Sequence, residues 1–420
     1  MQSFALPRAN RLVTVTHLFV SRRPRFSRRV ALVALPALLI GVGCGDDPRA
    51  NVASSATDAI VDGTVALGVG AIPGRPGYGN VVRGLELAVA RLNERADSSA
   101  RGSQRVRFRL RLPDKSATSA VRVAEALRSD ASVIGVIGHP ESGNTLEAIP
   151  VYADAEHAGA NAVVAVSPTA SSPQLSGISP WFFRVAPSDN DAAKFVAQWV
   201  FDSLQAKRAA IIYRNDSYGR EWSRAFADAF ETRGARVVER QPYLTGITEW
   251  DAYAQLIAVD QPDVVLFPGD APDAIALLKA LAALNVRIPF VGGDGTEAMR
   301  SAPEAEGARF VAFFRPERAT GIESQVFLQR YRDAYNEEPD MFAALSYDAA
   351  LAIGRAVLAG ARTRVAVRDA LERLGNGVAP VQGVAGPIAF ERDHDIAGRA
   401  VVVTTIGREG TPSARLGSAR

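Results

Sequence analysis

The sequence predicts an α/β protein built of two doubly wound, Rossmann-like lobes. Short apolar runs alternate with amphipathic stretches along nearly the whole chain, which is the pattern of strands followed by helices. Several of the apolar runs are continuous, such as residues 133–138 and 263–267, and fit strands of a parallel sheet covered on both faces. The alternation is too long for one sheet, and 420 residues suffice for two apolar cores.

Eight strands are expected in the first 300 residues, over 64–72, 105–112, 132–138, 162–167, 209–213, 236–240, 263–267 and 288–291. In the run at 105–112, apolar residues alternate with arginines, which predicts an edge strand with one face in water. Helical patterns lie between the strands, over residues 80–95, 119–128, 144–158, 191–204, 219–233, 252–259 and 273–284.

The order of these elements predicts the domain organisation. Residues 61–187 would begin the first lobe, and the chain would cross near Asp189 into the second lobe, 188–314. A return over about 315–377, with helices at 322–336 and 341–361, would complete the first lobe. The last strands, near 386–390 and 400–405, would re-enter the second lobe at about 378–408, which makes three crossovers. Residues 409–420 are expected to form a loose tail.

The first 43 residues have the order of a secretory signal, with arginines, an apolar run and small residues before Cys44. A bacterial lipoprotein signal requires a cysteine at the cleavage point, because its thiol takes the lipid. The run of about 13 residues is shorter than the roughly 20 that a spanning helix needs. Gly41 stands where a leucine is usual, so an ordinary cleaved signal, a short membrane anchor and twin-arginine export stay open. We predict an extracytoplasmic protein, periplasmic or at the cell surface, anchored to the membrane through lipid on Cys44 and a flexible tether over 44–60.

Removal of this signal changes the charge balance. It carries seven arginines and no acid, so the remaining chain has 41 Lys and Arg against 45 Asp and Glu, about −4. No basic stripe remains, and a nucleic-acid partner is not expected. Cys44 is the only cysteine, which excludes an internal disulfide.

The sequence argues against two classes of function, dinucleotide binding and catalysis. Gly68, Gly70 and Gly74 follow a strand and precede a helix, as in a dinucleotide-binding loop, but Pro73 and Pro76 interrupt the turn. No cofactor is therefore expected. The chain after the signal has only three histidines, at 139, 157 and 394, in no metal-ligand spacing, and it has no Gly-x-Ser-x-Gly motif. We predict neither a metal site nor an enzyme.

Polar groups gather where two neighbouring strands of the first lobe end. Ser142 opens a helix after the strand at 133–138, and the turn from Thr169 through Ala170 to Ser171 follows the next strand. Open α/β sheets bind ligands at this edge, and hydroxyls with free N–H groups suit a carboxylate. Each residue also has a structural explanation, Ser142 as an N-cap and Thr169 and Ser171 as turn residues.

The second lobe offers a group of opposite charge. Asp294 follows the strand at 288–291 between two glycines, which leaves its carboxylate bare for an ammonium group, although an Asx-turn would explain it too. Tyr218 follows the strand at 209–213, and Tyr78 lies in the first loop. Carboxylate donors, an acid and aromatic rings together predict a site for a zwitterion of the amino-acid type.

At this point the sequence resembles a known family, the type I periplasmic binding proteins of the branched-chain amino-acid (Leu/Ile/Val-binding) class, over about 62–405. The resemblance rests on short motifs: Tyr78-Gly79 before Gly84-x-x-x-Ala88, Gly138-His139 with Ser142, Ser167-Pro168-x-x-Ser171, Phe183-Arg184 with Pro187-x-Asp189, Tyr218-Gly219, Gly293-Asp294-Gly295 and Ser346-Tyr347-Asp348.

The resemblance implies roles for these residues. It implies that the ligand carboxylate is held by Ser142 and by the groups at Thr169 and Ser171, and the amine by Asp294. Tyr78 and Tyr218 would line or close the site, and Asp189 matches a family aspartate at the lobe crossing. It also implies two lobes joined by three crossovers that close on a small ligand and deliver it to an ABC permease.

Three departures bear on the ligand. Glu141 places a negative charge beside Ser142, Asp294 replaces a longer glutamate, and Asp270 stands where an aromatic or small residue often contacts the ligand side chain. Extra acid would favour a ligand with additional positive charge or disfavour an acidic one. The expected function is a solute-binding lipoprotein for a small amino acid. The alternative is a sensor or envelope-enzyme activator of the same fold that works through protein contacts.

Overall fold

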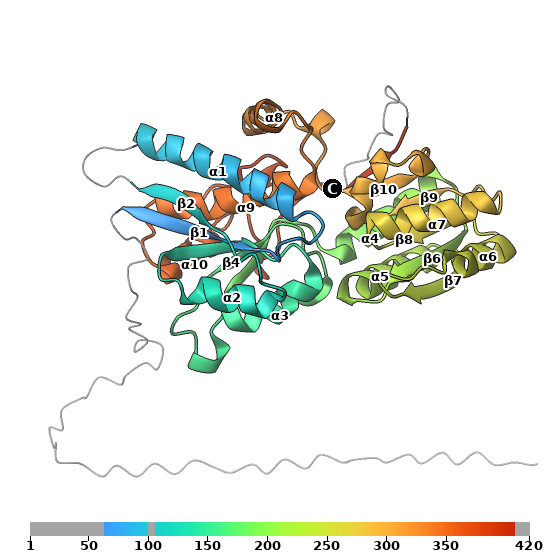
Figure 1. Cartoon of the computed structure of the whole chain (residues 1–420), viewed down its shortest axis with the longest axis horizontal. Coiled ribbons are helices and arrows are strands. Elements are labelled where there is room, and N and C mark those ends of the chain that lie inside the picture. The colour runs from blue at the N-terminus through green and yellow to red at the C-terminus, as the bar shows by residue number, and fades with distance from the viewer. Residues whose placement is uncertain (1–62, 100–105, 408–420) are drawn as a thin grey trace, which may run out of the picture. The chain divides into compact units, whose positions relative to one another are not determined.

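The computed structural model describes residues 63–99 and 106–407 (Figure 1). The predicted signal, Cys44, the tether and the tail over 409–420 lie outside these residues. Within them the chain forms two mainly parallel sheets, each covered by helices on both faces, and a small two-stranded sheet. The expected α/β class with doubly wound lobes is confirmed.

The first sheet has five parallel strands in the order β2-β1-β3-β4-β5. They are β1 (Thr64–Gly70), β2 (Arg107–Arg111), β3 (Val133–Gly138), β4 (Ala165–Ser167) and β5 (Phe182–Arg184). As expected, β2 lies at an edge, where Phe108 is buried and Arg107 and Arg109 are exposed. The helices of this lobe are α1 (Tyr78–Ser99), α2 (Ala120–Ser129), α3 (Ser142–Tyr152), η1 (Ala155–His157), η2 (Pro173–Leu175), α8 (Ile322–Tyr335), α9 (Met341–Leu358) and α10 (Arg364–Glu372).

The second sheet has six strands in the order β13-β10-β9-β8-β6-β7, parallel except for β13. They are β6 (Arg208–Arg214), β7 (Arg236–Tyr243), β8 (Val264–Phe267), β9 (Phe290–Gly292), β10 (Arg309–Ala312) and β13 (Val402–Thr405). Its helices are α4 (Asp189–Ser203), α5 (Ser217–Glu231), α6 (Trp250–Asp260), α7 (Ala271–Ala283), η3 (Asp294–Ser301), η4 (Pro303–Ala305) and, near the return to the first lobe, η5 (Pro316–Arg318).

The continuous apolar strands are buried on both faces, as the sequence predicts. In β1, Val65 and Leu67 pack into the cluster that contains Ile353 of α9, whereas Ala66 between them packs into the cluster that contains Leu127 of α2. Successive side chains of a strand point to opposite faces, so each face of the sheet needs its own apolar cover. The same division holds in β6, where alternate residues enter two different clusters.

Three connections join the sheets: β5 to α4, β10 to α8, and the segment before β13. One expected strand lies elsewhere. The run near 386–390 was expected in the second lobe, but β12 (Pro387–Ile388) pairs with β11 (Val381–Gln382) in a separate small sheet. The physical reason is that Asp348 of α9 accepts hydrogen bonds from the N–H groups of Val384 and Ala385, which holds this segment on the first lobe. That part of the predicted lobe assignment is wrong.

Buried charges lie beside the connections. Arg184, at the end of β5, pairs with Asp395 at 2.6 Å from both Nε and Nη2. Arg399 donates from Nε to the carbonyl of Val185 at 3.1 Å and forms a buried ion pair with Asp348. Removing one partner of such a pair would leave a buried charge uncompensated, so these contacts fix where the connections begin and end.

Among the described helices, α9 alone has the length and apolar composition of a membrane span. However, 83% of its residues are buried inside the fold. It packs along α1 (Figure 1) and fills the core of the first lobe, so its composition is explained by burial in protein.

Candidate functional site

One wall of the candidate site is built at the ends of β3 and β4. Ser142 is the first residue of α3 and is 3% exposed. Its Oγ accepts hydrogen bonds from the N–H groups of Ser171 at 3.2 Å and Ser172 at 3.1 Å. The two adjacent strand ends therefore come together, as the sequence predicts. The Ser142 hydroxyl proton stays available as a donor.

Two of the predicted donors are used within this wall. The Thr169 hydroxyl donates to the carbonyl of Pro140 at 2.7 Å, and the Ala170 N–H donates to Ser167 Oγ at 3.0 Å. The Ser171 hydroxyl, by contrast, is buried and has no hydrogen-bond partner among the residues that the structure describes. Buried hydroxyls in folded proteins are nearly always paired. Ser142 and Ser171 are thus the side chains of this wall with donors to spare.

Asp189 opens α4 beside this wall. Its N–H donates to the carbonyl of Ser171 at 2.8 Å, and the residue is fully buried. Neither carboxylate oxygen has a hydrogen-bond partner among residues 63–99 and 106–407. A buried carboxylate without partners is costly, and such a group in a native fold calls for a cation or a proton.

The opposite wall carries Asp294, the first residue of η3, which is 4% exposed. The Tyr218 hydroxyl, from the first turn of α5, donates to Asp294 Oδ1 at 2.8 Å. Gly293 permits this contact, because a Cβ at that position would lie 2.2 Å from the Tyr218 oxygen. The glycine flanking the aspartate thus has a steric role that the sequence pattern suggested.

The two buried acids perturb each other. Burial raises the pKa of Asp294 to about 6, while the Tyr218 hydrogen bond opposes the rise. Burial, and after it the charge of Asp294, raises the pKa of Asp189 well above its usual value. The Ser171 hydroxyl, which lies near the Asp189 carboxylate without meeting hydrogen-bond geometry, and the charge of Arg184 act on the pKa of Asp189 in the opposite direction. Both carboxylates would ionise more readily beside a bound cation.

An arginine that is not among the residues predicted from sequence, Arg214, acts on this pair through Asp294. Arg214 ends β6 and donates from Nε to Asp216 at 2.5 Å and from Nη1 to Asp270. Its guanidinium carbon lies 5.6 Å from the centre of the Tyr218 ring. Burial acts to lower the pKa of Arg214, but the two aspartates outweigh it and raise the pKa. The signal available in the sequence was its position at a strand end.

The walls also touch across the two lobes. Gln174 donates to Glu221 of α5 at 3.2 Å, and a Cβ on Gly143 of α3 would lie 3.7 Å from Ser217 Oγ. Tyr78 is half-buried at the start of α1, and its hydroxyl forms no hydrogen bond to the other predicted site residues within the described part of the chain. The structure thus brings together seven of the eight predicted ligand residues and leaves Tyr78 apart from their network.

A match to the family model described as "periplasmic binding protein" spans residues 74–411. The chain belongs to the periplasmic binding protein family. Periplasmic binding proteins of ABC importers are extracytoplasmic substrate-binding proteins. The two walls described above therefore face each other in a fold whose members bind solutes.

Named relatives share this fold and part of the sequence. The Leu/Ile/Val-binding protein homolog 1 of Brucella suis is 23% identical over 341 residues, which cover 80% of this chain and 87% of that protein. The branched-chain amino acid transporter substrate-binding protein LivJ of Streptococcus pneumoniae, solved with isoleucine, has a TM-score of 0.71 at 24% identity and covers 82% of this chain and 96% of its own. An ABC transporter substrate-binding protein of Desulfitobacterium hafniense, solved with leucine, has a TM-score of 0.68 at 26% identity. The match covers 81% of this chain and 97% of that protein.

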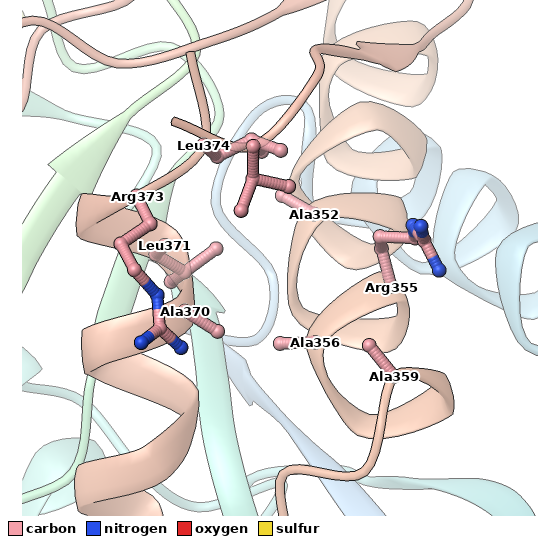
Figure 2. A pocket seen from close by; sticks show the side chains of 9 residues that line it. Ala352, Arg355, Ala356, Ala359, Ala370, Leu371, Arg373 and Leu374 are labelled. Carbon is pink, nitrogen blue, oxygen red and sulfur yellow. The ribbon is translucent and has the colours of Figure 1, made fainter. Parts of the chain in front are cut away.

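An apolar pocket lies elsewhere, between α9 and α10, with a volume of about 100 Å³. Figure 2 shows Ala356, Leu371 and Leu374 pointing into the space between the helices, with Arg355 and Arg373 at its margins. None of the predicted site residues lines it. It has no buried polar group to orient a polar ligand, so the inter-lobe site remains the candidate.

A second pair of acids, the buried Glu297 and the half-buried Asp340, joins η3 to the first lobe. Glu297 is 3% exposed and accepts a hydrogen bond from the N–H of Met341, the first residue of α9, at 3.1 Å. Arg300 and Arg315 lie 3.6 Å from its other oxygen. Burial, and after it the charge of Asp340, raises the pKa of Glu297 to about 7. Asp340 itself accepts from Asn80 at 2.5 Å.

This pair predicts a pH dependence of stability. Since the pKa of Glu297 is about 7 in the folded state and 4.5 ordinarily, the folded state binds this proton more tightly, and stability is lost as pH rises from about 4.5 to 7. Glu297→Gln removes the cost of ionising this buried carboxyl. The melting temperature of the variant should therefore rise relative to that of wild type as the pH increases from 5 to 8. The corresponding gain in the free energy of unfolding over wild type should reach up to about 3 kcal/mol. Glu156→Gln, on an exposed turn, is the matched control and should follow wild type at both pH values. A variant whose offset from wild type is the same at both pH values would contradict the assignment.

Proposed function

We propose that this protein is an extracytoplasmic solute-binding lipoprotein that captures a small amino acid by closing its lobes and delivers it to an ABC importer. The observation that carries the proposal is the fully buried carboxylate of Asp189, which has no hydrogen-bond partner in the described part of the chain, senses the charge of Asp294 and lies next to the Ser142–Ser171 wall. An ammonium group would supply the missing charge, and a carboxylate would accept from the spare hydroxyls. The two solved relatives named above contain isoleucine and leucine, which are small amino acids.

Each proposed site residue has a role in this scheme. Ser142 and Ser171, with the turn at Thr169 and Ala170, hold the carboxylate on the first lobe. Asp294 and Asp189 meet the ammonium, and Tyr218 orients Asp294 through its hydrogen bond. Tyr78, at the start of α1, would close the site when the lobes come together on a ligand. A ligand that contacts both walls favours the closed form over the open one, because the open form offers only one wall at a time. Lipid on Cys44 would keep the protein at the membrane that holds the permease.

The proposal predicts binding that needs both charges of the amino acid. A panel of free α-amino acids, screened by thermal shift on the purified and dialysed protein, should contain members that raise the melting temperature, because a ligand at 100 times its Kd stabilises the native state by about 2.7 kcal/mol. The N-acetyl derivative, which lacks the ammonium, and the methyl ester, which lacks the carboxylate, should lose that shift. An N-acetyl derivative as effective as its parent would contradict the roles of Asp189 and Asp294. A panel without any shift would overturn the proposed function.

A further inference from the structure

The region around Tyr218 is charged where a site for an aliphatic side chain would be apolar. Four loops that each run from a strand into a helix bring charged groups here. Arg214 and Asp216 lie between β6 and α5, and Asp270 lies between β8 and α7. Glu141 precedes α3 on the facing lobe, and Arg75 precedes α1. Burial raises the pKa of Glu141, and Arg75 and then Arg214 act against that rise, so these groups sense one another across the lobes.

The cluster has more acids than bases. Arg214 is already held between two carboxylates, and Arg184, which acts on Asp189, is paired with Asp395. Of the arginines whose charges act on these acids, only Arg75 then remains to balance the other carboxylates; this count covers the described residues. The carboxylates of the site and its surroundings are five: Glu141, Asp189, Asp216, Asp270 and Asp294.

Asp270 lies close to the proposed ammonium site. A Cβ on Gly295, the residue after Asp294, would lie 3.4 Å from Asp270 Oδ1. Asp270 Oδ2 is the oxygen that accepts from Arg214, and Oδ1 accepts no hydrogen bond from any described residue. Burial raises the pKa of Asp294, and the charges of Arg214 and Asp270 act on it as well, in opposite directions. Asp270 Oδ1 thus remains a free acceptor beside Gly295 among the described residues, and the charge of Asp270 also acts on Glu141 of the facing lobe.

A zwitterion with an aliphatic side chain would leave this excess of negative charge in place. Its own carboxylate and ammonium cancel, and its methyl groups would desolvate Glu141 and Asp270 without compensation. An acidic side chain would add repulsion. A second cation on the ligand would neutralise the excess, and closure of the lobes over these partly exposed acids would strengthen the ionic interaction by excluding water.

We infer that the ligand is an α-amino acid whose side chain carries a second positive charge, of the lysine, ornithine or arginine kind. The inference rests on the proposed function and narrows its substrate class. The side-chain cation sits between Glu141 of the first lobe and Asp270 of the second, and the main-chain ammonium sits at Asp189 and Asp294. Specificity then comes from the same closure that binds the ligand, since the two acids that recognise the side chain lie on different lobes.

Isothermal titration of the purified, dialysed protein with L-lysine, L-arginine, L-leucine and L-glutamate tests this assignment. A basic amino acid should bind at least tenfold more tightly than leucine, and glutamate should bind more weakly than leucine. Leucine binding as tightly as the basic amino acids would overturn the inference and leave the proposed function standing. Absence of binding by all four and by the wider amino-acid panel would overturn both. Cadaverine, a diamine without a carboxylate, should bind at least tenfold more weakly than lysine, and equal binding would overturn an α-amino acid as the ligand class.

Single variants test whether Glu141 and Asp270 bind the side-chain cation. Glu141→Gln keeps an oxygen for Asn144, and it should weaken binding of the basic amino acid at least fivefold while leucine changes less than twofold. Asp270→Asn should do the same, and it serves where Glu141→Gln fails to fold by circular dichroism. The exposed Asp251→Asn on α6 is the matched control. Equal losses for the basic amino acid and leucine in both variants would contradict the assignment, because a merely structural role predicts equal losses.

Discussion

Replacing Asp294 by asparagine is expected to weaken amino-acid binding at least tenfold and up to about a hundredfold. Hydrogen bonds to charged groups contribute about 1.5–3 kcal/mol each, and the amide removes the charge that the ammonium would meet. The variant keeps the site's shape, because the amide oxygen still accepts from the Tyr218 hydroxyl. Titration calorimetry with the tightest amino acid from the panel measures the loss directly.

The same residue predicts a pH profile for binding. Burial raises the pKa of Asp294 to about 6 in the free protein, so the carboxylate is largely ionised at pH 7 and largely protonated at pH 5. A bound ammonium needs the ionised form, and affinity should therefore fall by up to about tenfold for each pH unit below 6. The asparagine in Asp294→Asn does not titrate. The amino-acid affinity of this variant should therefore vary less than that of wild type between pH 5 and pH 7. Asp251→Asn, exposed on α6, should reproduce the wild-type profile. Full affinity in Asp294→Asn would remove Asp294 from the ammonium site.

The parts of the fold that sequence predicted well are those fixed by burial on two faces. Continuous apolar runs such as that of β3 cannot be solvated on either side, so their place inside a covered sheet follows directly from composition. The strands that escaped prediction are short. β5 has three residues, β10 has four and β11 has two, which gives too little periodicity to separate a strand from a loop.

The misplaced strand β12 shows a limit of a different kind. Two residues pair with β11, and the position of the segment depends on the Asp348 carboxylate 36 residues away in the sequence. No local pattern carries that information. The strand-end rule, in contrast, correctly brings Ser142 to Ser171 and Tyr218 to Asp294, because parallel strands deliver their carboxyl ends to one edge of a sheet. Arg214 was missed because its role depends on pairing with Asp270, a contact between two different loops.

A large effect on stability is expected from Gly84→Ala in α1. A Cβ on Gly84 would lie 2.2 Å from the carbonyl oxygen of Ala343 and 2.8 Å from its carbonyl carbon. Ala343 is a fully buried residue of α9, so its carbonyl cannot turn away without moving the helix. Alanine favours an isolated helix over glycine by about 1 kcal/mol, but overpacking a close helix contact typically costs about 1–3 kcal/mol and occasionally more. Here the clash is with backbone, and we expect a net loss of about 2–4 kcal/mol in the free energy of unfolding.

The same helix provides the control. Gly79 lies one and a half turns before Gly84, and a Cβ there meets nothing within 4 Å. Gly79→Ala should be neutral or stabilise by up to about 1 kcal/mol, since alanine restricts the unfolded chain at no steric cost. Denaturant unfolding of the two variants beside wild type measures the contrast. If Gly84→Ala were as stable as Gly79→Ala, α1 would be free to move away from α9. The close approach of these helices would then not fix the start of α1, including the Asn80–Asp340 contact that ties it to α9.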